Sequence, residues 1–137
     1  MLRDVSVPLI GFALTALALP VQAQQASPDS ATIAAAVQTL RSDLRYYLTG
    51  QEAFYADHNT YAATAQATAQ ATNFAPNQSV TVVVLTSSDR GHSAVAIHSV
   101  VPGIVCGIWV GAEPTPPLGD GASEGRPTCR IPDPTRM

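Results

Sequence analysis

The side chains with the clearest chemistry in this chain are two cysteines, Cys106 and Cys129. They are separated by 22 residues, so they form neither a CxxC redox motif nor a haem-attachment motif. An even number of cysteines in an oxidising compartment favours a disulfide. Closing a loop of this length is expected to stabilise the fold by about 3 kcal/mol. We therefore predict a structural disulfide between Cys106 and Cys129.

The three histidines and the helical carboxylates are spaced too widely for a shared site. His92 and His98 fall six residues apart in a predicted strand, on one face but about 20 Å from each other. Asp43 and Glu52 are nine residues apart on a predicted helix, roughly 13 Å along its axis. His58 stands where that helix is expected to end. We expect surface histidines, no metal or cofactor, and no enzymatic activity.

Trp109, the single tryptophan, is the best candidate for a binding contact. In a strand it alternates away from the face shared by Cys106 and Ile108. An exposed indole can anchor a sugar or a protein partner, and this defines an alternative function as a secreted small-ligand or carbohydrate binding module. The favoured expectation is that the proline-rich segment covers Trp109, with Pro116 or Pro117 stacked on it.

A long helix over residues 31–58 is predicted from apolar side chains at intervals of three and four. Asp29 or Ser30 can cap its start, and Asn59 can adopt a left-handed conformation at its end. Gly50 weakens the middle of the helix by about 1 kcal/mol relative to alanine. The apolar face consists of Ile33, Val37, Leu40, Leu44, Tyr47, Leu48, Gln51, Phe54 and Tyr55.

Three strand candidates lie within residues 79–110, at 79–86, 92–99 and 104–110. Short connectors between them suit antiparallel turns. Alternate valines of the first candidate share one face, so the helix can cover one side of a sheet. The predicted fold class is α+β, with a long N-terminal helix packed on a small antiparallel meander of three to four strands.

Two further segments have weaker patterns. Residues 62–78 repeat ATAQ and hold no large apolar residue before Phe74, so we expect a loosely packed connector with one or two helical turns. Residues 111–137 are rich in proline and glycine as far as Pro127, and they are predicted to be a disulfide-bounded loop and tail.

Residues 1–23 are typical of a cleavable export signal. Arg3 precedes an apolar run of about 15 residues, and Ala23 suits a signal peptidase. The run is shorter than the roughly 20 residues that span a bilayer. We expect residues 24–137 to form one exported domain after a polar lead at 24–30, with no membrane span after signal removal. The net charge of −3 and the lack of a basic cluster exclude nucleic acid as a partner.

The stretch LRYYLTGQEAFYADHNTYA, at residues 44–62, resembles the head domain of type IV pilins. CGIWVG at 106–111 and EGRPTC at 124–129 are similar to elements of small pilin-like proteins. The resemblance covers about residues 40–129. It implies a bacterial pilin or pseudopilin-like structural protein, periplasmic or extracellular, whose export signal replaces the hydrophobic stem. A minor alternative is a short-stemmed pilin processed between Gly11 and Phe12, although Ala16 stands where such a pilin has glutamate.

The predicted helix, about 42 Å long, exceeds the predicted strands of about 20–27 Å. Its first turns are therefore expected to find little to pack against, which would leave Ile33, Val37 and Leu40 partly exposed. Such a surface favours self-association or docking on a protein partner. The alternative is that these turns fray or are covered by the disulfide-bounded loop.

Overall fold

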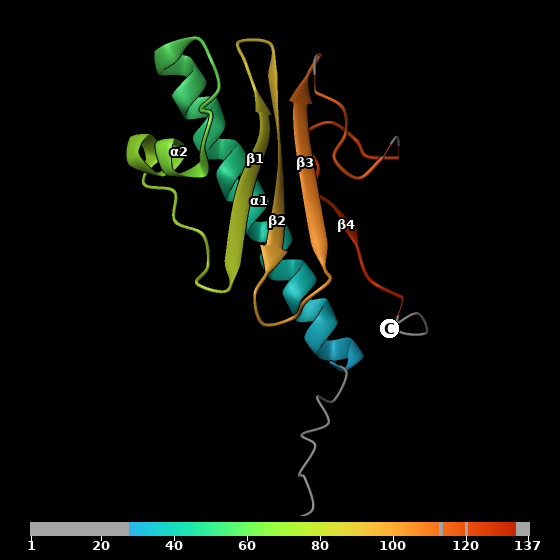
Figure 1. Ribbon diagram of the computed structural model, residues 1–137. Helices are drawn as coiled ribbons and strands as arrows, with labels where there is room; N and C mark the ends of the chain where they lie inside the picture. Colours follow the sequence, from blue (N-terminus) through green and yellow to red (C-terminus); the bar gives the residue numbers. More distant parts are fainter. Residues whose placement is uncertain (1–27, 113, 120, 134–137) are drawn as a thin grey trace, which may run out of the picture.

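The structure is a computed structural model that describes residues 28–112, 114–119 and 121–133. In chain order its elements are α1 (Ser30–His58), α2 (Ala65–Thr72), β1 (Val80–Ser87), β2 (Gly91–His98), β3 (Val105–Gly111) and β4 (Thr128–Arg130). Each strand pairs antiparallel with the next, so the sheet is a meander. Figure 1 shows α1 crossing the sheet obliquely, with its first turns beyond the ends of the strands. The predicted α+β fold is confirmed.

The predicted export signal and the Gly11–Phe12 processing site lie outside the described residues. Among the residues that are described, no helix combines the length and the apolar character needed to cross a membrane.

Both ends of α1 are fixed by the residues that the sequence singled out. The Asp29 side chain accepts a hydrogen bond of 2.7 Å from the Thr32 N–H, which satisfies one amide of the first turn. Asn59 adopts the left-handed conformation at φ 54°, and its N–H donates to the Tyr55 carbonyl. The predicted helix and its two caps are confirmed, with Asp29 as the N-cap.

The core lies between α1 and the face of the sheet that α1 covers. Leu40, Leu44 and Tyr47 from the helix are fully buried there. Alternate strand residues meet them, because side chains two apart share one face of a strand. These strand residues are Val80, Val82, Ala94, Ala96, Cys106 and Ile108.

The disulfide between Cys106 and Cys129 is confirmed. The two residues stand directly opposite each other on β3 and β4, with their Cα atoms 3.9 Å apart. Thr128–Arg130 is therefore a short strand, whereas the sequence predicted only loop and tail there. The bond holds this segment against β3 at a place where its own sequence has little strand character. The other three strands begin within one residue of their predicted starts.

The connector between α1 and β1 is packed more tightly than predicted. It contains the expected two turns of helix, as α2, but Thr68 is fully buried. Gly50 makes this possible, because a Cβ built there would lie 2.7 Å from Thr68 Cγ2 and 2.8 Å from Thr72 Oγ1. Small residues, and not large apolar ones, anchor α2 on α1. The expectation of loose packing was wrong because it considered only large side chains.

Candidate interaction surface

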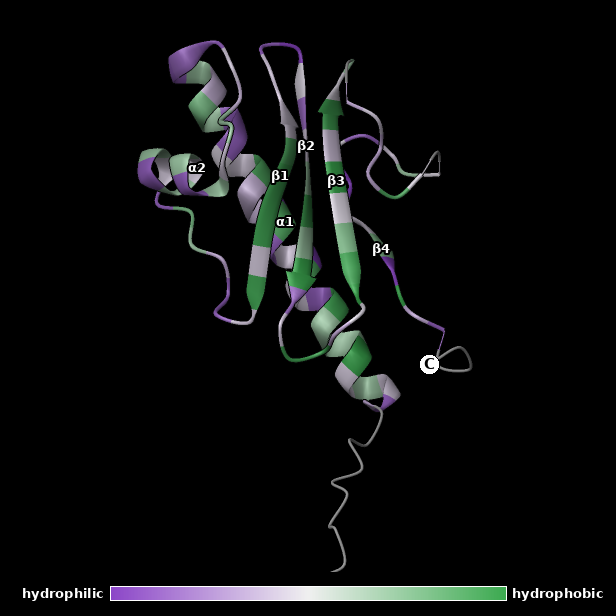
Figure 2. Ribbon diagram, in the orientation of Figure 1, coloured by the Kyte–Doolittle hydropathy of each residue, from purple (hydrophilic) through white to green (hydrophobic). Residues whose placement is uncertain are grey.

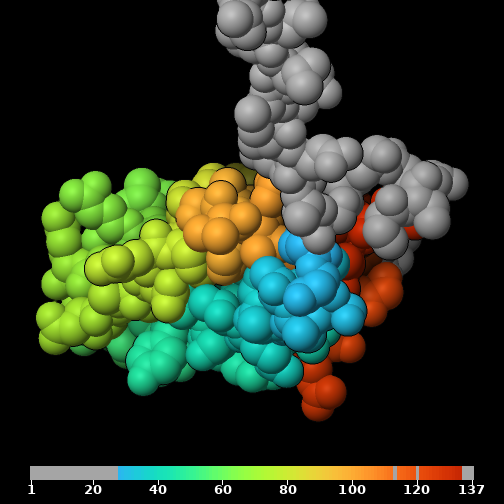
Figure 3. Space-filling view, turned by 90° about the horizontal axis from the view of Figure 1, so that it is seen from below, coloured from blue at the N-terminus to red at the C-terminus, as the bar shows by residue number. Residues whose placement is uncertain are grey.

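The N-terminal half of α1 does not present the apolar surface that the sequence predicts. Val37 and Leu40 are buried, and Ile33 is half-buried. The cover comes from residues 99–104, the β2–β3 turn, whose Val101 and Ile104 are buried in the same core. Figure 3, seen from this end, shows the orange β2–β3 turn against the blue start of α1. The prediction of exposure was wrong at Val37 and Leu40, because it compared helix length with strands and left out the turn.

A shallow hollow of about 290 Å³ remains at this end of the molecule. Val100 stands at its margin with 73% of its surface exposed. The side chains around the hollow are small or polar: Thr32, Ala35, Ala36 and Thr39 from α1, Ser79 and His98 from the strand ends, and Val101.

The outer face of the sheet, which is the face turned away from α1, carries exposed apolar side chains that the sequence analysis did not single out. Val83 and Ile97 are each 44% exposed there. Val83 is paired with Val95, and Ile97 with Val105, so the four residues form two neighbouring cross-strand rows. We call Val83, Val95, Ile97 and Val105 the outer apolar patch.

The sequence contained a signal for this patch. Residues 82–85 are Val-Val-Val-Leu, an unbroken apolar run. In a strand with one face in water, polar residues would alternate with apolar ones instead. Figure 2 shows the resulting continuous green along most of β1. A run of this kind puts apolar side chains on both faces of a strand, and only one face of this sheet is covered by α1.

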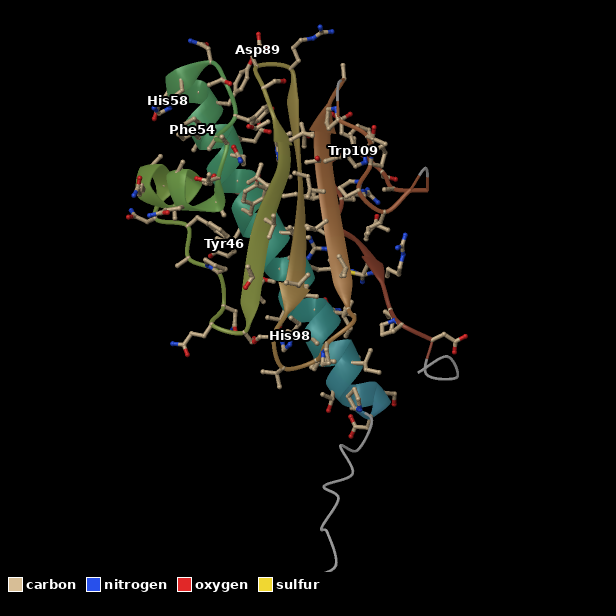
Figure 4. All side chains as sticks on the ribbon, in the orientation of Figure 1. Tyr46, Phe54, His58, Asp89, His98 and Trp109 are labelled. Carbon is tan, nitrogen blue, oxygen red and sulfur yellow. A yellow bond between two sulfur atoms is a disulfide. The ribbon has the colours of Figure 1, made fainter. Side chains whose placement is uncertain are left out.

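Trp109 lies at the border of the outer face and is half-buried. Its indole Nε1 is buried and has no hydrogen-bond partner within the described structure. Figure 4 places it on the side of β3 next to the proline-rich loop. The loop is tied there, because the Gly125 N–H donates to the Trp109 carbonyl and the Gly111 N–H donates to Glu124 Oε1.

The proline-rich loop also covers the strand beside Trp109. A Cβ built on Gly107, two residues earlier on the same face, would lie 3.1 Å from Pro117 and 3.3 Å from Leu118. The loop therefore packs on the outer face of β3, with Pro117 above Gly107, whereas the stacking of Pro116 or Pro117 on Trp109 stays a prediction.

The most polar part of the interior joins α1 to β2 near the C-terminal end of the helix. Gln51 Nε2 donates to the Tyr47 hydroxyl at 2.6 Å, which leaves the Tyr47 hydrogen directed to His92 Nδ1 at 3.5 Å. The Tyr61 ring lies 4.5 Å from the His92 ring, centroid to centroid. Tyr47, Gln51 and His92 are fully buried, whereas Tyr61 is half-buried.

His92 is fully buried, so the prediction of a surface histidine was wrong at this position. Its place on β2 points it at α1, where it meets Tyr47 and Tyr61. Burial lowers the pKa of His92 to about 4, and it raises the pKa of Tyr47 well above the ordinary value. Both side chains are therefore neutral at pH 7.

The remaining titratable candidates lie apart from this cluster. His58 is exposed, stacks on Phe54 and donates from Nδ1 to the Phe54 carbonyl. Asp43 accepts from the Asn77 N–H, and Glu52 accepts from the Tyr61 hydroxyl. Within the described residues there is no group of three or more His, Cys, Asp or Glu side chains able to hold a metal ion.

Tyr46, which the sequence did not single out, is the most exposed aromatic side chain described, at 69%. Two shallow hollows of about 370 and 200 Å³ adjoin it on the surface shared by α1 and α2. Their walls are Arg45, Thr49, Gly50, Ala53, Thr72, Asn73 and Phe74. Helical spacing places Tyr47 on the apolar face and Tyr46 off it, but it gives no sign that the surface beside Tyr46 is hollowed.

Neither a protein-family model nor a curated protein sequence matches this chain.

Proposed function

We propose that the protein is an exported, non-enzymatic, pilin-like interaction protein that self-associates through the outer apolar patch. The CGIWVG and EGRPTC segments that carry the pilin resemblance are joined by the disulfide between Cys106 and Cys129. The helix on a meander of four strands supports the same proposal, because it is the arrangement that the resemblance implies.

The observation that carries the proposal is the exposure of the outer apolar patch. Val83 and Ile97 leave nearly half of their surface in water, in adjacent rows that also contain Val95 and Val105. The only charged residue in these rows is Arg130, which pairs with Val105 at the β4 edge. An apolar face with a single charge, at its edge, favours contact with a like face.

Sedimentation velocity over a range of concentrations tests this proposal. The wild-type protein should form dimers or larger species, and Ile97→Asp should be monomeric because the added carboxylate would be buried without a partner. Val100→Asp is the matched control, since it adds the same charge at the exposed β2–β3 turn.

Two results of this experiment contradict the proposal. If Val100→Asp dissociates the protein and Ile97→Asp does not, the contact lies at the helix end, as the sequence predicted. If the wild-type protein is monomeric at all concentrations, self-association through the patch is wrong.

The export proposal has its own test, which is N-terminal sequencing of the protein from its native host. A chain that begins at Gln24 supports removal of residues 1–23 as a signal. A chain that begins at an N-methylated Phe12 supports the alternative of a short-stemmed filament component.

A carbohydrate-binding function is the second candidate, and Tyr46 favours it more than Trp109 does. Tyr46 offers an open ring face, and sugars stack their C–H groups on such rings. Thr49 and Thr72 each donate their hydroxyl hydrogen to a backbone carbonyl, so each hydroxyl can take part in further hydrogen bonds only as an acceptor. Arg45 and Asn73 add donors beside the hollows.

Saturation-transfer NMR with neutral hexoses tests this second function. Signals from the sugar should be seen with wild-type protein and Trp109→Phe, and lost with Tyr46→Ala. Equal signals with Tyr46→Ala and wild type would exclude the Tyr46 hollows as the site.

A further inference from the structure

His98 ends β2 and makes hydrogen bonds on both sides of its ring. Nδ1 lies 3.3 Å from the Val100 amide nitrogen and 3.1 Å from that of Val101, so it accepts two backbone N–H groups of the β2–β3 turn. Nε2 lies 3.2 Å from the Ser79 hydroxyl oxygen, at the start of the neighbouring strand. Figure 4 shows His98 where β2 meets the turn.

The position of the His98 proton follows from the groups around it. Asn77 Oδ1 accepts from both the Ser79 N–H and the Ser79 hydroxyl. Because the single hydroxyl hydrogen of Ser79 is used there, its oxygen must accept from His98 Nε2–H. His98 is therefore the neutral tautomer with hydrogen on Nε2, and its bare Nδ1 is the acceptor for the turn.

The turn that His98 holds is the cover of the helix end. Val101, whose N–H donates to His98, is buried in the same core as Val37 and Leu40. Ile104 completes this cover from the far end of the turn. If the turn lifts, the side chains that lose their cover are apolar residues of α1.

We propose that His98 is an acid-sensitive latch that holds the β2–β3 turn over the N-terminal half of α1. Protonation adds a hydrogen to Nδ1, which then donates and no longer accepts. The N–H groups of Val100 and Val101 then lose their acceptor. The positively charged imidazolium also faces their hydrogen atoms, which carry partial positive charge, so the contact becomes repulsive. Acid thus favours the open turn and exposes Val37 and Leu40. The latch does not depend on the outer apolar patch or on self-association.

The groups described on the elements around His98 are as follows. On α1 the hollow beside His98 is lined by Thr32, Ala35, Ala36 and Thr39, none of which titrates. Asp43 is bound to the Asn77 N–H, and Asp29 is bound to the first turn of α1. From the β4 side, Pro132 packs on Gly103 of the turn, with Arg130 and Asp133 as its charged neighbours in sequence.

Amide hydrogen exchange between pH 7 and pH 5 tests the latch in the oxidised protein. Both pH values lie above the His92 pKa of about 4, so His92 stays neutral and does not contribute to the change. After correction for intrinsic exchange, the protection of the Val100 and Val101 amides should fall about tenfold or more in the wild-type protein. The protection of the Val95 amide, which lies in the β1–β2 pair opposite Val83, should stay constant.

His98→Asn is the decisive variant, because an asparagine oxygen can accept from the amides two and three residues on without titrating. Protection of Val100 and Val101 should then be independent of pH, whereas His98→Ala should lose it at both pH values. His58→Asn, at an exposed histidine, should behave as wild type. The latch is wrong if wild-type protection does not change with pH, or if it falls equally in His98→Asn.

Discussion

Gln51 and Ala62 are joined by two hydrogen bonds between a side-chain amide and a backbone. Gln51 Nε2 donates to the Ala62 carbonyl at 3.0 Å, and the Ala62 N–H donates to Gln51 Oε1 at 2.8 Å. Both residues are buried. The glutamine thus supplies the backbone partners that the chain lacks after α1, and it fixes the direction in which the chain turns back toward α2.

Replacing Gln51 with leucine should lower the free energy of unfolding by about 3 kcal/mol, because the buried N–H and carbonyl of Ala62 lose their partners. Urea unfolding followed by circular dichroism measures the loss. Gln38→Leu, at an exposed position of the same helix, is the control and should change stability by less than about 0.5 kcal/mol. A similar loss in both variants would contradict the role given to Gln51.

His92 should make the protein less stable in acid. Its pKa in the folded state, about 4, lies below the ordinary histidine value, so the unfolded chain binds the proton more readily. The stabilising difference is complete above about pH 6.5 and is lost as the pH falls toward 4, a total of about 3 kcal/mol.

Thermal or urea unfolding in the His98→Asn background isolates the His92 contribution, because residue 98 then has no imidazole. His92→Phe in that background should flatten the dependence between pH 7 and pH 4. A slope that persists in the phenylalanine variant would assign the acid sensitivity to other groups.

Gly50→Ala should destabilise the protein although alanine is the better helix former. The new Cβ would lie 2.7 Å from Thr68 Cγ2, and the overpacking is expected to cost about 1–3 kcal/mol against a propensity gain of about 1 kcal/mol. Thr68→Ser removes the crowded methyl group, so the double variant should recover part of the loss. The measurement is the urea midpoint of Gly50→Ala, Thr68→Ser and the double variant. If Gly50→Ala is more stable than the wild-type protein, α2 can move away from α1 without a loss of stability.

Reduction of the disulfide should lower the free energy of unfolding by about 3 kcal/mol, from the loop-closure entropy of the unfolded chain. Since β4 has three residues and one pairing strand, its amides should lose protection first. Unfolding with and without reductant, together with exchange of the Thr128 amide, measures both effects. Unchanged stability after reduction would mean that the native state strains the bond.

The sequence predicted the features that local chemistry determines. Asp29 and Asn59 have side chains and backbone preferences that fix the ends of α1 without reference to the rest of the chain. The pairing of Cys106 with Cys129 follows from their number alone. Helix and strand spacing then led to the correct arrangement of α1 on an antiparallel sheet.

The path of connecting segments was beyond the sequence. Val37 and Leu40 are buried because the β2–β3 turn bends toward α1, and no spacing rule gives that direction. His92 is buried because its neighbours Tyr47 and Tyr61 come from distant parts of the chain. In both cases the burial depends on contacts with residues that are distant in the sequence.

The meander also determines how simply this molecule can mature. Each strand pairs with its neighbour in sequence, so the sheet can be assembled in the order in which the chain is made. The bond between β3 and β4 comes last, and the chain contains no third cysteine to compete for either partner. Maturation therefore requires an oxidant but no disulfide isomerase.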